Sequence, residues 1–285
     1  MILVTAATGQ VGSAALNILA ASGAEVRAVV RDPSAFAAPE GVDVVQGDFD
    51  DDASMAKALE GVAVMLLAGR DGPDSVSQHR RILAQVRQAR VRHVVKLSAI
   101  GASPGSPIAL MREHHEVDEE VRKGPAGWSL LKPHLYMQNL LRAANAVRRE
   151  GKLAPMGPNR FPLVDTRDVG AAVAVVLRDP AAHPGKEYAL TGPVAVSYEE
   201  VAKALTAITD HAVTYEAVAP PEFEDRLRTA GMPEWRAYDL AHIASAYRAS
   251  ENIVSPDLAM LLGRQPRSLS EFLEDHRDAY SSDRV

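Results

Sequence analysis

The first twelve residues constrain the fold of this chain more than any other segment does. An apolar run over residues 1–4 is followed by a turn of small residues that carries Gly9 and Gly12, and a helical pattern begins at Val11. A buried strand that leads through a tight turn into a helix directs the unpaired N–H groups of that helix toward one point, where they attract a phosphate. We therefore predict a phosphate-binding turn between the first strand and the first helix.

Short apolar runs alternate with longer amphipathic segments through the first 135 residues. This alternation is typical of repeated strand–helix units, and uniformly apolar strands are typical of a parallel sheet covered by helices on both faces. Gly23, Gly61 and Gly124 follow three of the expected helices and are expected to end them in the left-handed conformation. The expected strands are residues 1–5, 25–30, 43–46, 62–67, 93–97 and 128–131, and the expected helices are 11–21, 53–59, 75–88 and 108–122.

The pattern changes after Pro133. The segments expected there are a helix over 136–149, a loop over 151–158, a helix that Asp165 or Thr166 begins and that runs to 177, a strand over 186–190, mostly helices afterwards with one strand at 213–218, and a frayed tail after 280. We expect an α/β fold with a doubly wound parallel Rossmann sheet in a domain of residues 1–190, whose core is 1–135. A smaller, mostly helical C-terminal lobe of residues 191–285 is expected to bind the substrate.

Composition excludes several classes of function. The formal net charge is −6 and basic residues occur in runs no longer than pairs, which argues against nucleic-acid binding. The chain has no cysteine, which excludes disulfides, thiolate nucleophiles and cysteine-bound zinc. No apolar stretch reaches the roughly 18 residues that span a bilayer, and no signal peptide precedes the first strand. We expect a cytoplasmic protein that does not act on membranes.

A dinucleotide fold places its cofactor across the carboxyl ends of its central strands, so the residues that follow each strand are the informative ones. Arg31 lies nineteen residues beyond Gly12. A guanidinium at this position suits a ribose 2′-phosphate, whereas the neighbouring Asp32 would suit a 2′-hydroxyl. We expect NADP(H) in preference to NAD(H). The turn itself offers Thr8, Gly9, Gln10 and Val11 to the pyrophosphate.

Further cofactor contacts are expected after the third, fourth and fifth strands. Asp48 either binds the adenine amine or, with residues 50–52, caps the next helix. Gly69 lets the backbone pass close to a ribose, and Ser98 is expected near the nicotinamide. The expected contacts in these segments are Gly47, Asp48, Phe49, Ala68, Gly69 and Ser98.

An ordered set of motifs resembles the NmrA-like family, an atypical branch of the short-chain dehydrogenase/reductase superfamily. The motifs are TAATGQVG at 5–12, VVRDP at 29–33, GD at 47–48, HVVKLSAIGA at 93–102, LKP at 131–133, YMQN at 136–139, VDTRDV at 164–169 and YALTGP at 188–193. The resemblance covers residues 1 to about 275 and implies NADP(H) in the cleft between a Rossmann domain and a small lobe. Roles known in the family are the reduction of quinones and triphenylmethane dyes, and cofactor sensing without catalysis.

Two departures from the family pattern are informative. The family turn has glycine where this chain has Ala6, and a β-carbon there would either crowd the pyrophosphate or shift the turn. Alanine is the smallest such change, so we expect weakened rather than abolished binding. Superfamily dehydrogenases reduce carbonyls with a Tyr-x-x-x-Lys pair. None of the seven tyrosines has lysine four residues later, and the expected helix at 108–122 contains no tyrosine. Ordinary ketone reduction by that pair is therefore not expected.

Hydride transfer to a quinone or another conjugated acceptor does not need the missing tyrosine, because water can protonate the stabilised anion that forms. His114 is a candidate proton donor with a pKa near neutrality, or a helix histidine bonded to a carbonyl or to the cofactor ribose. Lys132 is a candidate to hold a developing oxyanion, a cofactor phosphate or a nearby carboxylate. A metal at His114, His115 and Asp118 is not expected, because adjacent helical side chains diverge by about 100°.

Aromatic and apolar residues suggest where an acceptor binds. Phe223 and Met232 belong to an aromatic-rich group that also includes Trp235 and Tyr238, and this group suggests a pocket wall for a flat ring or simple packing of the lobe. Asp165 and Asp168 flank a helix start and are expected to cap it. The candidate substrate contacts are Tyr136, Met137, Asn139, Trp235 and Tyr238.

Three functions are compatible with these features. The first is an NADPH-dependent reductase of quinones or other conjugated aromatic compounds. The second is a sensor that binds NADP(H) without turnover and signals to a protein partner. The third is a fold that has lost its cofactor and serves in the complex of another enzyme. A homodimer is compatible with each of them.

Overall fold

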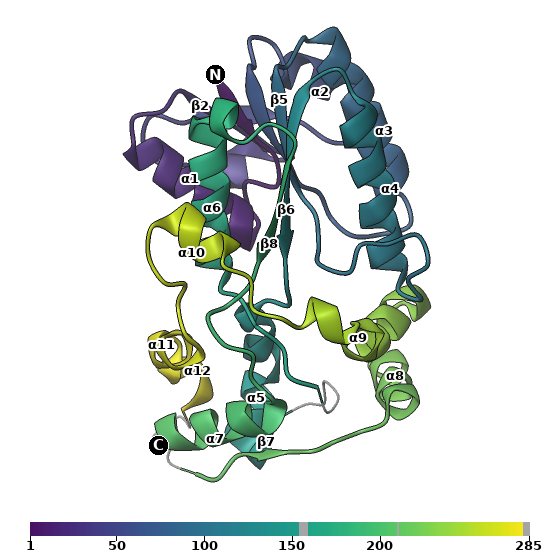
Figure 1. Cartoon of the computed structure of the whole chain (residues 1–285), viewed down its shortest axis with the longest axis vertical. Coiled ribbons are helices and arrows are strands. Elements are labelled where there is room, and N and C mark those ends of the chain that lie inside the picture. Colours follow the sequence, from purple (N-terminus) through teal and green to yellow (C-terminus); the bar gives the residue numbers. More distant parts are fainter. Residues whose placement is uncertain (154–158, 210, 282–285) are drawn as a thin grey trace.

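A seven-stranded parallel sheet forms the centre of the protein (Figure 1), with the strand order β3-β2-β1-β4-β5-β6-β8. The computed structural model describes residues 1–153, 159–209 and 211–281. The strands are β1 Ile2–Val4, β2 Val26–Val30, β3 Asp43–Gln46, β4 Val64–Leu67, β5 His93–Leu97, β6 Gly127–Pro133 and β8 Lys186–Leu190. This is the doubly wound α/β architecture predicted from the sequence.

Helices cover both faces of the sheet. One face carries α1 Gln10–Ala21, α6 Thr166–Arg178 and α10 Asp257–Leu262, and the other carries α2 Asp52–Ala58, α3 Ser75–Gln88 and α4 Ala109–Lys123. The four residues of β4 are all buried, as expected for a strand with helices on either side. Because both faces are covered, the ends of the parallel strands remain as the place where a ligand can bind.

The C-terminal region adds helices below the carboxyl edge of the sheet (Figure 1). A second hydrophobic cluster joins residues 135–163 to residues 198–280, so the lobe takes side chains from both halves of the sequence. A boundary at residue 190 remains a prediction. The elements are η2 Met137–Ala143, α5 Ala144–Glu150, β7 Lys152–Leu153, α7 Tyr198–Ile208, β9 Thr214–Tyr215, α8 Pro220–Thr229, α9 Glu234–Ala246, α11 Leu269–Asp275 and α12 Arg277–Tyr280, and short 3-10 turns are η1 Pro33–Ala35, η3 Pro180–Ala182 and η4 Ala249–Glu251.

Several local predictions need correction. The predicted helix at 136–149 begins as the 3-10 turn η2, because Met137 N–H donates to the Val164 carbonyl and holds the chain there. The predicted strand at 213–218 shortens to β9, which pairs with β7 in the first part of the predicted loop. The rest of that loop, 154–158, and the tail beyond Ser281 lie outside the described residues.

Two of the three predicted glycine caps are confirmed. Gly23 and Gly61 have φ angles of 71° and 72°. Gly124 instead has φ −68° and ψ 161°, so its predicted left-handed conformation is wrong. The ring of Pro125 clashes with a helical conformation of the preceding residue and favours this extended one.

Asp165 and Asp168 differ in role although both lie at the start of α6. Asp165 caps the helix by accepting from Arg167 N–H, as predicted. Asp168 does not cap it: its fully buried carboxylate accepts from the Arg264 guanidinium and from Arg267 N–H, both at 2.6 Å. These contacts of Asp168 hold the segment after α10 against α6. Among the described residues, no helix has the length and apolar character needed to cross a membrane.

In the turn between β1 and α1, one residue other than glycine has a left-handed backbone conformation. Ala6 has φ 50°, a conformation that costs an L-residue about 1–2 kcal/mol. Ala6→Gly is therefore expected to raise the free energy of unfolding by about 1 kcal/mol, after allowance for the greater freedom of glycine in the unfolded chain. Urea denaturation measures this change.

Ala7→Gly is the matched control for this substitution. Ala7 is fully buried and lies outside the left-handed region, so glycine there should lower stability through lost packing and greater unfolded-state entropy. A fall in stability for Ala6→Gly equal to that of Ala7→Gly would contradict a strained turn.

Candidate active site

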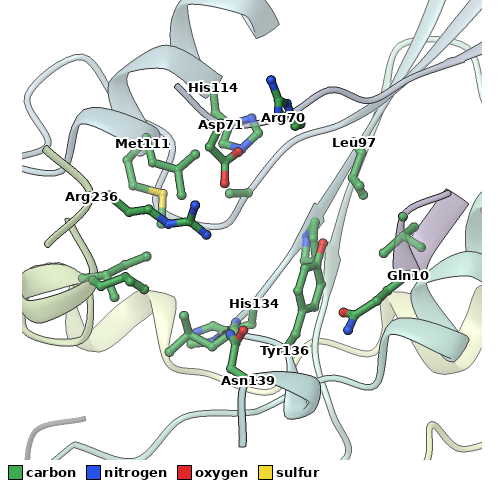
Figure 2. A pocket seen from close by; sticks show the side chains of 18 of the residues that line it. Gln10, Arg70, Asp71, Leu97, Met111, His114, His134, Tyr136, Asn139 and Arg236 are labelled. Atoms are coloured by element: carbon green, nitrogen blue, oxygen red, sulfur yellow. Dashed lines mark hydrogen bonds between the residues drawn. The ribbon is translucent and has the colours of Figure 1, made fainter. Parts of the chain in front are cut away.

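A cavity of about 710 Å³ opens at the carboxyl ends of β1, β4, β5 and β6. Its lining comes from the first turn, the loop after β4, the end of β5, α4 and the segment after β6, and α8 and α9 close it from the lobe. In Figure 2 Gln10 lies on one side and Arg236 on the opposite side, with Tyr136 and Asn139 between them. The volume falls in the range of small-molecule sites.

The first turn has the form of a phosphate cradle. Gly9 is the N-cap of α1 and has no side chain that could bond the N–H groups of the first helical turn. Gln10 and Val11, which belong to this turn, line the cavity, so their N–H groups are placed where a phosphate could bind. A β-carbon on Gly12 would lie 2.2 Å from the Ala6 carbonyl oxygen, so only glycine fits at this position in the first turn of α1. Thr8, also predicted to bind, is exposed and does not line the cavity.

Glycines at the neighbouring edge of the sheet let the backbone pack closely against protein side chains. A β-carbon on Gly69 would lie 2.8 Å from the His79 ring, and one on Gly47 would lie 2.5 Å from the Val29 side chain. Ala68, Gly69 and Ser98 line the cavity, as expected of residues near a cofactor. The shape of this edge fits an extended nucleotide that runs from the first turn past the ends of β4 and β5.

Arg31 and Asp32, the two residues weighed for cofactor selection, have different surroundings. The Asp32 carboxylate accepts from Ser34 N–H at 3.0 Å and from Ser34 Oγ at 2.6 Å, and these hydrogen bonds lower its pKa. The Arg31 side chain is exposed at the end of β2, and no described residue pairs with its guanidinium. A ribose substituent beyond β2 would therefore meet a free cation and an engaged carboxylate.

The segment after β3 lies beyond the cavity. The helix-capping alternative belongs to Asp51, which accepts from Ala53 N–H and Ser54 N–H, whereas Asp48 accepts from Asp50 N–H. Gly47 and Phe49 accompany Asp48 along this edge of the sheet. The adenine contact predicted for Asp48 remains a prediction.

Lys132 is not part of the cavity lining. Its ammonium pairs with the Glu187 carboxylate, which the Arg122 guanidinium also contacts. Of the alternatives weighed for this residue, the structure shows the ion pair with a nearby carboxylate. β6 lies next to β8 in the sheet, and this neighbour supplies Glu187.

The lysine that does line the cavity is Lys96, which sequence reasoning missed. It lies at the end of β5, is 1% exposed, and its Nζ donates to the Leu97 carbonyl at 2.9 Å. The same Nζ lies 2.9 Å from His114 Nδ1 and 3.5 Å from Asp118 Oδ1. The available signal was a charged residue within an otherwise apolar strand, since a central strand buries lysine only when other groups compensate it.

His114 and Asp118 lie four residues apart on one face of α4. The resemblance places the Tyr-x-x-x-Lys pair on this helix, and here histidine and aspartate have the same spacing. Asp118 Oδ2 accepts from Ser98 Oγ at 2.6 Å, so the hydroxyl of Ser98 is already engaged. The ion pair of Asp118 and Lys96 is buried at both ends.

Burial governs how these groups titrate. It lowers the pKa of Lys96 to about 8, against the opposing effect of the Asp118 carboxylate. Burial, reinforced by the charge of Lys96, holds the pKa of His114 well below its ordinary value, so the expectation of a value near neutrality is wrong. Burial also lowers the pKa of His79, whose Nδ1 lies 2.7 Å from the Ser75 carbonyl, to about 4. Both histidines are therefore neutral at physiological pH.

The acceptor side of the cavity differs in part from the prediction. Tyr136 and Asn139 line it, whereas Met137 is buried in the second hydrophobic cluster. Trp235 and Tyr238 do not line it. The residues of α9 that do are Arg236, Leu240 and Ile243. Their spacing of four and three residues puts them on one face of the helix, and the two predicted aromatics fall on other faces.

Asp239 attaches α9 to the rest of the site. Its carboxylate accepts from Ala109 N–H at 3.0 Å and from Leu110 N–H at 2.9 Å, at the start of α4. Two further carboxylates, Asp71 and Glu113, face the same space, and the enclosing protein raises the pKa of both. The described part of the chain contains no group of three or more His, Cys, Asp or Glu residues that could hold a metal ion.

Comparison with known proteins places this site in a family. The NmrA-like family model matches residues 1–273. The NAD(P)H azoreductase of Xenophilus azovorans is 31% identical over 99% of this chain and all of that protein. The NADPH complex of the Escherichia coli quinone oxidoreductase QOR2 has a TM-score of 0.87 and 28% identity over 97% of this chain and 99% of that one. The triphenylmethane reductase of Citrobacter sp. with NADP(H) has a TM-score of 0.85 and 27% identity over 96% and 99%. The chain belongs to the NmrA-like family.

Proposed function

We propose that this protein is an NAD(P)H-dependent reductase that transfers hydride to a quinone or another conjugated acceptor. The observation that carries the proposal is the continuity of one cavity. It begins at the phosphate cradle of α1, passes His114 on α4 and Lys96 at the end of β5, and ends against side chains of α8 and α9 that are apolar except for Arg236. A cofactor and an acceptor bound along this cavity would meet beside His114.

The residues of the chain divide the work along the cavity. A bound nicotinamide would supply the hydride. The first turn of α1 would hold the pyrophosphate, and the cofactor would run past Gly69, which lines the cavity at the end of β4. Apolar side chains of α8 and α9, with Tyr247, would hold a flat acceptor and exclude water.

The similarity to reductases at about 30% identity supports the same class of reaction. The alternative function is a sensor without turnover. Such a sensor needs the phosphate cradle of α1 but has no use for the part of the cavity that α8 and α9 enclose. The same holds for a chain that has lost its cofactor. The cavity between α4 and α9 therefore favours the reductase over both.

A panel of quinones should accelerate the oxidation of NADPH by the purified protein, followed by absorbance at 340 nm. Catalysis is expected because one cavity would hold both reactants in contact, which is the main requirement for hydride transfer. Tight NADPH binding by calorimetry with no turnover for any acceptor would support the sensor instead. The absence of binding to either coenzyme would overturn both.

Arg31→Ala should weaken NADPH binding and leave NADH binding unchanged. A charge-assisted hydrogen bond to a 2′-phosphate contributes about 1.5–3 kcal/mol, so the Kd for NADPH should rise roughly 10- to 100-fold. Arg178→Ala is the matched control, since Arg178 is an exposed arginine at the far end of α6. An equal loss of affinity for both coenzymes would remove Arg31 from cofactor selection.

A further inference from the structure

We propose that Lys96 is the source of the proton that accompanies hydride transfer, that His114 relays it to the acceptor, and that Asp118 is the positioning residue for Lys96. The inference rests on the proposed function and deepens it. Lys96 lies between the other two groups, since its Nζ is 3.5 Å from Asp118 Oδ1 and 2.9 Å from His114 Nδ1. His114 lines the cavity (Figure 2).

The hydrogen bonds of Lys96 determine how His114 is protonated. An ammonium has three donors and no acceptor. Its donors face the Leu97 carbonyl, His114 Nδ1 and Asp118 Oδ1. His114 Nδ1 must then accept, so Nε2 carries the hydrogen of the neutral ring. No described residue hydrogen-bonds Nε2, and His114 lines the cavity, so this N–H is available to an acceptor.

The proton transfer balances without an added reactant. Hydride from the bound cofactor enters the conjugated acceptor, and the electron pair that it displaces settles on an acceptor oxygen. That oxygen takes the proton of His114 Nε2, and Nδ1 takes a proton from the Lys96 ammonium. The ring stays neutral in its other tautomer and Lys96 becomes a neutral amine. Water in the open cavity then protonates Nε2, and Nδ1 returns its proton to Lys96.

The titration of the two groups is consistent with these roles. His114 stays neutral because of its burial, so it conducts a proton rather than storing one. Lys96, with a pKa of about 8, is protonated at neutral pH and still able to release a proton. Its protonated form exists below that pKa, so the relay should slow as pH rises through about 8.

Groups on every neighbouring element act on Lys96. Asp118 on α4 and Asp71 in the loop after β4 favour its charged form, whereas Lys132 on β6 opposes it. On α3, His79 faces the same region and is neutral. Asp118 is the nearest of these carboxylates, and its Oδ1 has no hydrogen bond other than the 3.5 Å ion pair. Without Asp118 the ammonium would be stabilised far less.

Two acceptors with different proton requirements test the relay in the full-length protein with NADPH. A quinone takes up a hydride and a proton, whereas a triarylmethyl cation dye takes up a hydride alone and becomes a neutral leuco dye. Lys96→Met combined with Asp118→Asn removes the proton source without leaving a buried carboxylate unpaired. Lys132→Met is the matched control, because Lys132 lies outside the cavity and Glu187 keeps its contact with Arg122.

The double variant is expected to reduce the quinone on the order of 100-fold more slowly, the low end of general acid catalysis, while the rate with the dye at pH 7 stays within about twofold. The wild-type quinone rate should fall above pH about 8, in step with the pKa of Lys96, and the variant should lack this limb. Lys132→Met should leave both rates at pH 7 unchanged and should keep the fall at high pH, moved slightly to higher pH because Lys132 no longer opposes the charged form of Lys96. Lys96→Arg, which keeps the charge but cannot release a proton, should be as slow with the quinone as the double variant.

Equal losses with both acceptors would overturn the relay and make Lys96 a structural residue. Retention of the quinone rate in Lys96→Arg would overturn it as well, because charge alone would then be sufficient. If the wild type reduces only the quinone, a double variant whose rate falls at high pH as the wild-type rate does would also overturn the relay. A wild type that reduces neither acceptor is a different result, since it contradicts the proposed function itself.

Discussion

The close approach of two backbone segments at the first turn fixes the position of α1, and with it the end of the cavity where we expect a phosphate to bind. Helix α1 begins so near the Ala6 carbonyl that Gly12 leaves no room for a β-carbon. The same helix packs on α6 through small residues, where a β-carbon on Gly170 would lie 2.5 Å from that of Ala14. Because α1 is fixed on both sides, its first N–H groups point along the carboxyl edge of the sheet. The cavity follows that edge from the cradle to the lobe.

Much of this architecture could be predicted from the sequence, because short apolar runs alternate with longer amphipathic segments. The strands at 43–46, 93–97 and 186–190 and the helix at 75–88 have the predicted bounds. The cofactor edge could be predicted for the same reason, since parallel strands bring their carboxyl ends together. Gly124 shows the limit of local rules, because a following proline overrides the preference for a left-handed cap.

The charged groups of the cavity could not be predicted with equal success, and the two lysines show why. Lys96 and Lys132 lie near the ends of adjacent strands on the face that α4 covers, and the sequence does not reveal which of them α4 buries. The order of the strands decides it: β5 lies beneath His114 and Asp118, and β6 lies beside the carboxylate of β8. Likewise the pKa of His114 depends on burial that no local pattern reveals. Trp235 and Tyr238 were predicted from aromatic content, but the side of α9 that faces the cavity is set by packing.

The attachment of α9 through Asp239 links the wall of the cavity where we propose that the acceptor binds to the helix that carries His114. The carboxylate binds the first turn of α4, and α4 carries His114 one turn further along. A substitution that shifts α9 to admit a larger acceptor is therefore expected to displace α4, the helix that carries the imidazole of His114. New substrate ranges could evolve in this lobe through side chains such as Leu240 while the frame that Asp239 anchors stays still. The cavity wall on α9 and the helix that carries His114 are thus connected through the hydrogen bonds of one carboxylate.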